Sequence, residues 1–210
     1  MSLSTNHARR PLAVRAATAL VITLGVLLIP ALADQWVFVH WYNPNVYGTE
    51  WGRLLRVMGW WPTWLIAAAA VFLQRRGVDP VRAKRDAWLL LGSPAVAGVL
   101  CEVLKLVIRR ERPGLWNGAS VFRAFSEHPW STAGLATPSS HTMVAFGALT
   151  LMARLYPRAR WIWYALAWGC GLTRILDHAH FVSDVTFGAL LGWAVAWGLW
   201  MRFVPKTEAA

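Results

Sequence analysis

The strongest constraint on this chain is a series of predominantly apolar stretches, each about as long as a bilayer is thick. A transmembrane helix needs about 20 such residues. Six stretches come near that length, at residues 16–33, 57–74, 87–108, 140–156, 160–176 and 184–203. Because the bilayer core offers the backbone no water to bond with, each stretch is predicted to be helical. We therefore expect an all-α, polytopic membrane bundle of six transmembrane helices.

The composition agrees with a membrane protein. Hydrophobic residues make up 57% of the chain and charged residues 15%, against about 25% charged in soluble domains. The 15 tryptophans fit a chain that meets the membrane–water boundary, where Trp is enriched. We expect one membrane-integral domain over residues 1–210 and no separate soluble module.

The net charge of +11 would also suit a nucleic-acid-binding protein. The basic residues, however, lie in the gaps between the apolar stretches. Membrane lipids and an anionic substrate are therefore the expected partners, and nucleic acid is not. The sequence leaves the oligomeric state open.

The positive charges also predict an orientation, because cytoplasmic loops carry an excess of Lys and Arg. If residues 1–15 form a cytoplasmic tail, the cytoplasmic side holds 13 of the 21 basic residues. Most of the others lie in or beside three polar motifs on the opposite side, where we expect an anion to require them. The layout predicts a multi-pass protein of a bacterial inner membrane, with both ends cytoplasmic and a periplasmic loop at 109–137.

The first apolar stretch allows two interpretations. Its basic start, hydrophobic middle and ending Ala31-Leu32-Ala33 fit a cleavable signal peptide. Its length also approaches that of a spanning helix. We favour a retained first transmembrane helix.

The first polar motif places two cations near the end of the third stretch. Lys105 and Arg112 are seven residues apart, so they would share one face of a continuing helix, which Pro113 then discourages. A guanidinium fork and an ammonium point charge together suit a phosphate group. The alternative is a pair of side chains snorkelling at a helix end. Glu102 is expected to pair with Lys105 or with another cation of the motifs, in a structural role.

The second motif is Thr137-Pro138-Ser139-Ser140-His141. Thr137 suits an N-cap and Pro138 the first helical position. The next residues would then present free backbone N–H groups, which together with the helix dipole favour an anion. Ser139 can add a hydroxyl and His141 would stand beside the anion. The alternative is an ordinary capped helix with a surface histidine.

The third motif contains Arg174, His180 and Asp184. His180 and Asp184 are four residues apart and would share a face if the sixth helix began here. The carboxylate could then accept the Nδ1 proton of His180 and leave Nε2 free to attack phosphorus. The alternative is a structural hydrogen bond.

Together these motifs resemble the type 2 phosphatidic acid phosphatase superfamily, whose pattern is K-x6-R-P, then P-S-G-H, then S-R-x5-H-x3-D. The first motif matches fully, and the spacings of the others match. Ser140 stands where the family usually has Gly. Gly would leave more room, so Ser140 puts in doubt how closely the backbone can approach the phosphate. Thr173 replaces Ser and keeps a hydroxyl. The motifs cover residues 105–184.

The resemblance implies specific roles. His180 would be the nucleophile that forms a phosphohistidine, Asp184 would orient it, and His141 would protonate the leaving oxygen and later activate water. The phosphoryl oxygens would be held by Lys105, Arg112, Ser139, Ser140 and Arg174. The resemblance implies neither a metal ion nor a cofactor.

The sequence therefore predicts hydrolysis of a lipid phosphate or diphosphate at the periplasmic face. Undecaprenyl diphosphate, phosphatidylglycerophosphate, phosphatidic acid and a lipid A phosphate are all compatible substrates. A lipid phosphotransferase would use the same residues. A small polytopic transporter is a remote alternative, because it would place ionisable groups near mid-membrane.

Overall fold

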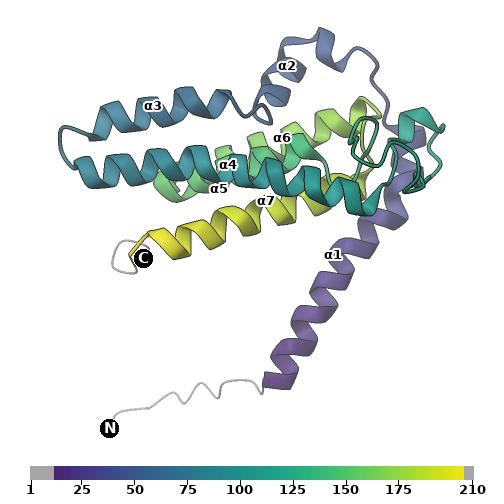
Figure 1. The fold of residues 1–210 in the computed structure, drawn as a ribbon, viewed down its shortest axis with the longest axis horizontal. Coiled ribbons are helices and arrows are strands. Elements are labelled where there is room, and N and C mark those ends of the chain that lie inside the picture. The colour runs from purple at the N-terminus through teal and green to yellow at the C-terminus, as the bar shows by residue number, and fades with distance from the viewer. Residues whose placement is uncertain (1–11, 206–210) are drawn as a thin grey trace.

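The computed structural model describes residues 12–205 and is helical (Figure 1). The α-helices are α1 (Leu12–His40), α2 (Glu50–Val57), α3 (Thr63–Arg75), α4 (Pro80–Ile108), α5 (Ser140–Leu155), α6 (Arg160–Leu176) and α7 (Val182–Phe203). Three 3₁₀ turns are η1 (Val46–Gly48), η2 (Pro113–Leu115) and η3 (Pro157–Ala159). Within the described part of the chain, β-pairing is limited to two isolated bridges in the loop between α4 and α5.

Most predicted stretches become single helices, but the second does not. Residues 57–74 were expected to form one span; instead α2 ends at Val57 and α3 begins only at Thr63. Gly59 and Pro62 lie in the interruption, and both residue types disfavour a helix interior. The resulting α3 has 13 residues.

Two described helices, α4 and α7, are long and apolar enough to cross a membrane. They support membrane association, while six spans remain a prediction. The expected cytoplasmic tail at 1–15 lies largely outside the described residues.

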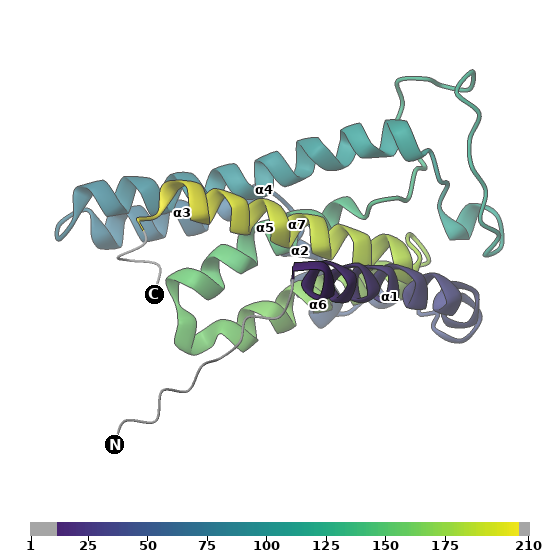
Figure 2. The ribbon, with the colours of Figure 1, turned by 90° about the horizontal axis from the view of Figure 1, so that it is seen from below.

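The functional motifs gather at one end of the bundle. They lie where α4 and α6 end and where α5 and α7 begin. The loop after α4 projects from that same end (Figure 2). Helix α1 meets the bundle only near its own C-terminal end, where Asp34 and Val37 are buried (Figure 1). Since α1 continues to His40, a cut after Ala33 would fall inside a helix.

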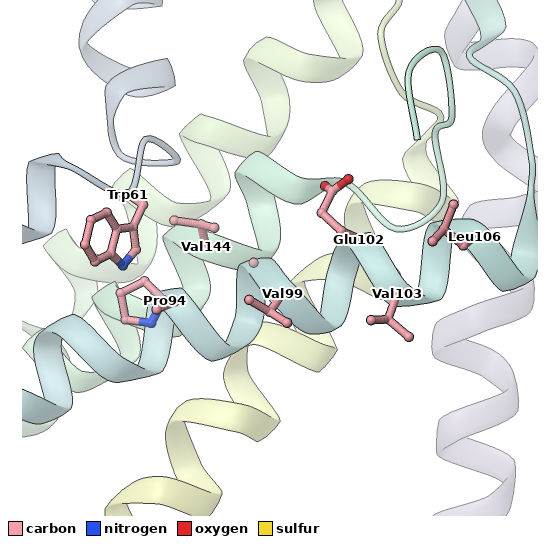
Figure 3. Close-up of a pocket in the computed structure, with 9 residues that line it drawn as sticks. Trp61, Pro94, Val99, Glu102, Val103, Leu106 and Val144 are labelled. Atoms are coloured by element: carbon pink, nitrogen blue, oxygen red, sulfur yellow. The ribbon is translucent and has the colours of Figure 1, made fainter. Parts of the chain in front are cut away.

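An apolar groove of about 570 Å³ follows one side of α4. Val99, Val103 and Leu106 of α4 line it, together with Trp61 and with Val144 of α5 (Figure 3). Its polar lining residue is Glu102, which lies toward the motif end of the bundle. The groove therefore connects an apolar surface to the polar motifs.

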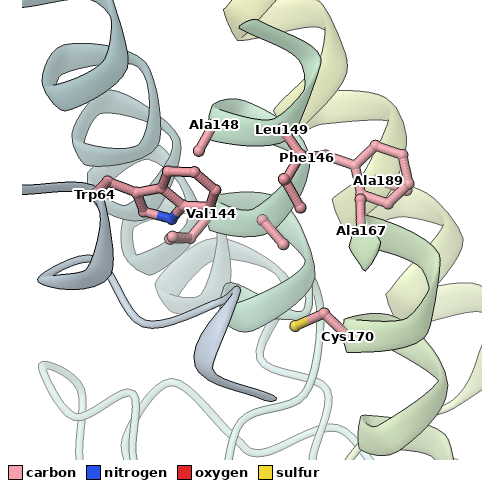
Figure 4. Close-up of a cluster of buried hydrophobic side chains, with 9 residues drawn as sticks. Trp64, Val144, Phe146, Ala148, Leu149, Ala167, Cys170 and Ala189 are labelled. Atoms are coloured by element: carbon pink, nitrogen blue, oxygen red, sulfur yellow. The ribbon is translucent and has the colours of Figure 1, made fainter. Parts of the chain in front are cut away.

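Helix α5 is the centre of the bundle and packs against α4, α6 and α7. It is apolar around most of its circumference, which is typical of a helix enclosed by others. Phe146 and Leu149 of α5 pack in one cluster with Trp64 of α3, Ala167 of α6 and Ala189 of α7 (Figure 4). The central position fixes the N-terminus of α5 relative to its neighbours.

Glycines bring α7 close to α5. A Cβ on Gly192 would lie 2.3 Å from the Met143 carbonyl oxygen, and one on Gly188 would lie 2.9 Å from the Ser139 carbonyl oxygen. The two glycines form a Gly-x-x-x-Gly pattern, which is typical of close helix packing in membranes. The contact therefore places the start of α7 against the start of α5.

Candidate active site

Hydrogen bonds join the three motifs. The Ser139 amide donates to the Asp184 carbonyl at 3.1 Å and the Gly114 amide to the His178 carbonyl at 3.1 Å. The Ser140 hydroxyl donates to Glu102 at 2.8 Å. Segments far apart in the sequence are thus held together at one end of the bundle.

The first motif is not one continuous helical face. Helix α4 ends at Ile108, and Arg109 adopts a left-handed backbone with φ 60°. Lys105 therefore lies on the last helical turn, while Arg112 follows in extended backbone. The prediction that both share a helix face is wrong, because the chain turns before Pro113. Lys105 is buried, and its Nζ lies 3.4 Å from Glu102, which confirms the expected pairing.

Three cations beside this motif bind groups of the protein itself. The buried Arg109 donates to four carbonyl groups of the following loop, those of Arg123, Ala124, Glu127 and Pro129. Arg123 pairs with Glu111 at 2.7 Å. Arg110 pairs with two buried carboxylates. The expectation that an external anion requires these three charges is therefore corrected.

The second motif begins its helix later than predicted. Helix α5 starts at Ser140 with Ser139 as the N-cap, and the Thr137–Pro138 peptide is cis. Thr137 is not the cap; its hydroxyl donates to Asp184. Ser139 is fully buried, its hydroxyl accepts from Thr142 at 3.0 Å and its amide is already bonded to Asp184.

His141 occupies the first turn of α5 beneath the linker between α2 and α3. A Cβ on Gly59 would lie 2.6 Å from the His141 Cβ, so only glycine allows the linker to approach this closely. The backbone and Cβ of His141 are thus covered by a segment that the motif pattern does not include.

The third motif places His180 just before α7, which begins at Val182. Its side chain is buried, and its Nδ1 lies 4.0 Å from the nearer Asp184 oxygen. That separation exceeds a hydrogen bond, so the predicted direct bond is not present. Arg174 is also buried and donates to the Tyr47 hydroxyl at 2.6 Å.

Asp184 is instead bonded by three other groups. One oxygen accepts from the Phe181 amide at 2.8 Å. The other accepts from Thr137 and, at 3.2 Å, from Arg110, whose guanidinium also reaches Asp34 of α1 at 3.0 Å. Arg110 therefore links α1, the loop after α4 and α7.

Burial and positive charge determine the protonation of His180. Its pKa is held well below the ordinary value, first by burial and then by Arg174, Lys105 and Arg112. The imidazole is therefore neutral at neutral pH. Burial also lowers the pKa of Arg112, and the charge of Arg174 lowers it further. These mutual effects indicate that the three cations lie near enough to the imidazole to act on it electrostatically.

Several buried donors in this cluster have no bonding partner. Among the described residues, Nε of Arg112, Nε of Arg174 and Nδ1 of His180 make no hydrogen bond. Buried polar atoms are rarely left unsatisfied. Two guanidiniums with unpaired donors, beside a buried lysine, suit a ligand rich in oxygen acceptors and negative charge.

A sequence profile described as the PAP2 superfamily matches residues 86–208, more than half of the chain. The chain belongs to the PAP2 superfamily. This confirms the predicted resemblance, and the matched region contains all three motifs.

Curated relatives include lipid phosphatases. A lipid A 1-phosphatase of Rhizobium johnstonii is 32% identical over 143 residues, which cover 61% of this chain and 57% of that protein. The bacitracin transport permease protein BcrC of Bacillus licheniformis is 38% identical over 55 residues, covering 26% and 27%. A probable diacylglycerol pyrophosphate phosphatase of Schizosaccharomyces pombe is 25% identical over 149 residues, covering 57% and 53%. The chain thus matches less than two thirds of each relative's length. No solved structure matches it.

The residues that the PAP2 pattern specifies are not the only ones that shape this site. Arg110, Tyr47 and Gly59 all contact motif residues or their backbone. Arg110 stands within the first motif, and its position opposite Asp184 could not be inferred from spacing. Tyr47 and Gly59 carry no local signal, because their partners are more than 80 residues away in sequence.

Proposed function

We propose that this protein is a metal-independent lipid phosphatase that works through a phosphohistidine at the periplasmic membrane face. One observation supports this most strongly. A buried, neutral imidazole at His180 lies within electrostatic reach of Lys105, Arg112 and Arg174, and both arginines have unpaired buried donors. Such a cluster can neutralise a phosphoryl group while a nitrogen attacks it.

In the proposed reaction, Nε2 of His180 attacks phosphorus and the bond to the leaving oxygen breaks. His141, whose imidazolium form is favoured by the negative charge of the bound phosphate, donates its proton to that oxygen. It then removes a proton from water, which attacks the phosphohistidine and releases inorganic phosphate and free His180. The three cations stabilise the charge that develops on the phosphoryl oxygens, assisted by Ser139 and the Ser140 amide.

Asp184 would orient His180 during this reaction. Its oxygen is 4.0 Å from Nδ1 in this structure. Catalytic hydrogen bonds are often longer before substrate binds and tighten in the complex. Because Arg110, Thr137 and the Phe181 amide hold the carboxylate in place, a small movement of the His180 ring would close the bond.

The groove along α4 supports a lipid substrate. It is lined almost wholly by apolar side chains, and its polar lining residue, Glu102, contacts both Lys105 and Ser140 (Figure 3). A phosphate held by Lys105 would therefore have an apolar channel beside it for an acyl or isoprenyl chain. The names of the lipid A 1-phosphatase and diacylglycerol pyrophosphate phosphatase relatives agree with this substrate class.

Phosphate release from purified protein tests the proposal. The panel contains undecaprenyl diphosphate, phosphatidylglycerophosphate, phosphatidic acid and a lipid A phosphate, each with and without a chelator. We expect release from at least one lipid, unchanged by the chelator. A phosphotransferase would instead move the phosphoryl group to an added lipid or alcohol acceptor.

A pair of histidine variants tests the nucleophile. His180→Asn should abolish release and leave no acid-labile phosphoprotein. His128→Asn, on the exposed part of the loop after α4, should retain activity. Near-normal release from a folded His180→Asn variant would refute the assignment.

A further inference from the structure

One cation near the candidate active site stands outside the family pattern and has no carboxylate partner. Arg56 lies in the last turn of α2, a short helix that packs on α6. Arg53 on the same helix pairs with Glu50, whereas Arg56 makes no ion pair within the described part of the chain. Its guanidinium stacks instead on the ring of Tyr47, 4.6 Å from the ring centroid. Because Arg56 is also exposed, its charge is accessible to a ligand.

Tyr47 connects Arg56 to a cation of the third motif. The Tyr47 hydroxyl accepts a hydrogen bond from Arg174 at 2.6 Å and donates one to the Thr173 carbonyl at 3.2 Å. The Arg174 guanidinium also lies 5.7 Å from the centroid of the same ring. Two guanidiniums thus share one aromatic ring. This arrangement brings like charges together, and a bound anion would relieve their repulsion.

The backbone of Arg56 lies beside His141. The Cys170 sulfur is 3.9 Å from the Arg56 carbonyl oxygen and 3.7 Å from the His141 carbonyl oxygen. A Cβ on Gly59, three residues after Arg56, would lie 2.6 Å from the His141 Cβ. Two separate contacts therefore hold the end of α2 against the start of α5.

The two histidines of the site differ in their electrostatic contact with Arg56. Arg56 acts on His141 more strongly than Lys105 does, although Lys105 belongs to the family pattern. At His180 the strongest charges are those of Arg174 and Lys105, and that of Arg56 is not among the main ones. Arg56 therefore lies on the side of His141, which protonates the leaving oxygen in the proposed reaction, and away from the nucleophile.

This position determines which part of a substrate Arg56 would meet. The leaving group of a lipid monophosphate is an alcohol, which carries no second charge. The leaving group of a lipid diphosphate is a lipid monophosphate, which carries a negative charge next to the reacting phosphate. A guanidinium matches two oxygens of a phosphate group, so an accessible arginine on this side suits the diphosphate.

We propose that Arg56, held by Tyr47, determines substrate specificity by binding a second phosphate between the reacting phosphate and the lipid, so that lipid diphosphates are preferred to lipid monophosphates. This inference rests on the proposed function. Nε2 of His180 attacks the terminal phosphorus, and the bond from that phosphorus to the bridging oxygen breaks. The bridging oxygen keeps the bonding electrons and leaves as part of the lipid monophosphate. It takes up the proton of His141, and Arg56 offsets the remaining charge.

Binding of hydrolysis-resistant lipids tests this subsite without turnover. The probes are an isoprenyl methylenediphosphonate and the isoprenyl monophosphonate with the same chain, titrated calorimetrically into the full-length protein in detergent. Losing a guanidinium–phosphate contact should weaken diphosphonate binding to Arg56→Gln about 10-fold, which corresponds to about 1.4 kcal/mol. The monophosphonate lacks the second phosphate, so its affinity should change by no more than about 2-fold, through the loss of a screened charge.

Phosphate release gives the same comparison with substrates. Diacylglycerol diphosphate is paired with phosphatidic acid, and undecaprenyl diphosphate with undecaprenyl phosphate. In Arg56→Gln, the ratio of kcat/KM for the diphosphate to kcat/KM for the monophosphate should fall about 10-fold. Arg56→Lys keeps the charge but not the planar fork, so it should recover part of that ratio. Arg53→Gln changes an exposed cation of the same helix that is already paired, and it should keep the wild-type ratio.

The outcomes separate this subsite from the proposed function. Equal losses for both phosphonates in Arg56→Gln, or no loss for either, would overturn the subsite even in a protein that releases phosphate from lipids. A loss of the same size in Arg53→Gln would also overturn it. If no lipid released phosphate while Arg56→Gln still lost diphosphonate affinity selectively, the proposed function would be wrong and the subsite would stand. Arg56→Lys provides the binding comparison if Arg56→Gln does not fold.

Discussion

At the scale of single residues, the candidate site depends on burying groups that water would otherwise stabilise. His180 is buried beside three cations, so its charged form is disfavoured twice, by desolvation and by repulsion. A neutral imidazole is the form that can act as a nucleophile. The same burial carries a cost in stability that pH should reveal.

Lowering the pH should destabilise the protein through His180. An unfolded histidine takes up a proton near pH 6.5, whereas the pKa of folded His180 is depressed. The unfolded state therefore binds more protons below about pH 6.5, and the free energy of unfolding falls as pH decreases from there toward the folded pKa. The stability that comes from keeping His180 neutral is fully present above about pH 6.5. Below that pH, the free energy of unfolding falls by at most ~1.4 kcal/mol for each pH unit.

Melting temperatures in detergent from pH 7.5 to 5.5 measure this effect. The wild type should lose stability across that range more steeply than His180→Asn, which lacks the titrating group. Parallel curves for the two proteins would contradict the depressed pKa.

Arg110 is not specified by the family pattern. Among such residues, we predict that its loss disturbs the site most. It is largely buried and contacts both Asp34 and Asp184, which are buried as well. Arg110→Gln would leave two carboxylates without their cation, and breaking such buried pairs costs about 3–5 kcal/mol. Thermal unfolding and phosphate release should both decline.

Arg53→Gln is the matched control for Arg110→Gln. Arg53 pairs with Glu50 on the surface of α2, where ion pairs contribute little. It should leave melting temperature and activity unchanged. If Arg110→Gln were as stable as this control, the linking role of Arg110 would be wrong.

At the scale of elements, the long apolar stretches of the sequence located most helices but not their ends. The end of α4 at Ile108 depends on the left-handed Arg109, whose guanidinium binds carbonyls 14 to 20 residues later. Helix α5 begins after Ser139, whose amide bonds to the α7 backbone. Such tertiary contacts determine where the helices begin and end, and the local helix propensity of the sequence cannot predict them. The motif residues themselves were predictable, because their chemical types and spacing are local.

The packing of α7 on α5 had a sequence signal that the motif analysis did not use. Gly188 and Gly192 form a Gly-x-x-x-Gly pattern in an apolar helix. Gly192→Ala would place a methyl group against the Met143 carbonyl, so we expect a loss of about 1–3 kcal/mol from overpacking. Thermal unfolding in detergent measures it.

Gly198→Ala provides the control on the same helix. Its Cβ would meet open space, and alanine is the better helix former by about 1 kcal/mol. This variant should be as stable as the wild type or more so. A Gly192→Ala variant that behaved in the same way would show that α5 and α7 are less closely packed than described.

At the scale of the whole molecule, the two ends of the bundle have different chemistry. The motif end gathers buried cations around His180, while the other end gathers arginines around Asp86. Between them lies a core that is almost wholly apolar. This separation follows from a membrane's own layers, because charged groups are costly in the hydrocarbon region.

The proposed orientation predicts which surfaces a membrane-impermeant thiol reagent reaches. Cys101 and Cys170 are fully buried and should not react in the folded protein. The Ser120→Cys variant, changed in the loop after α4, should be labelled in intact spheroplasts. The Arg158→Cys variant, changed in the turn before α6, should be labelled only in inverted membrane vesicles. Both positions are exposed, so the difference reports the side of the membrane and not burial; labelling of both from one side would rule out the transmembrane arrangement.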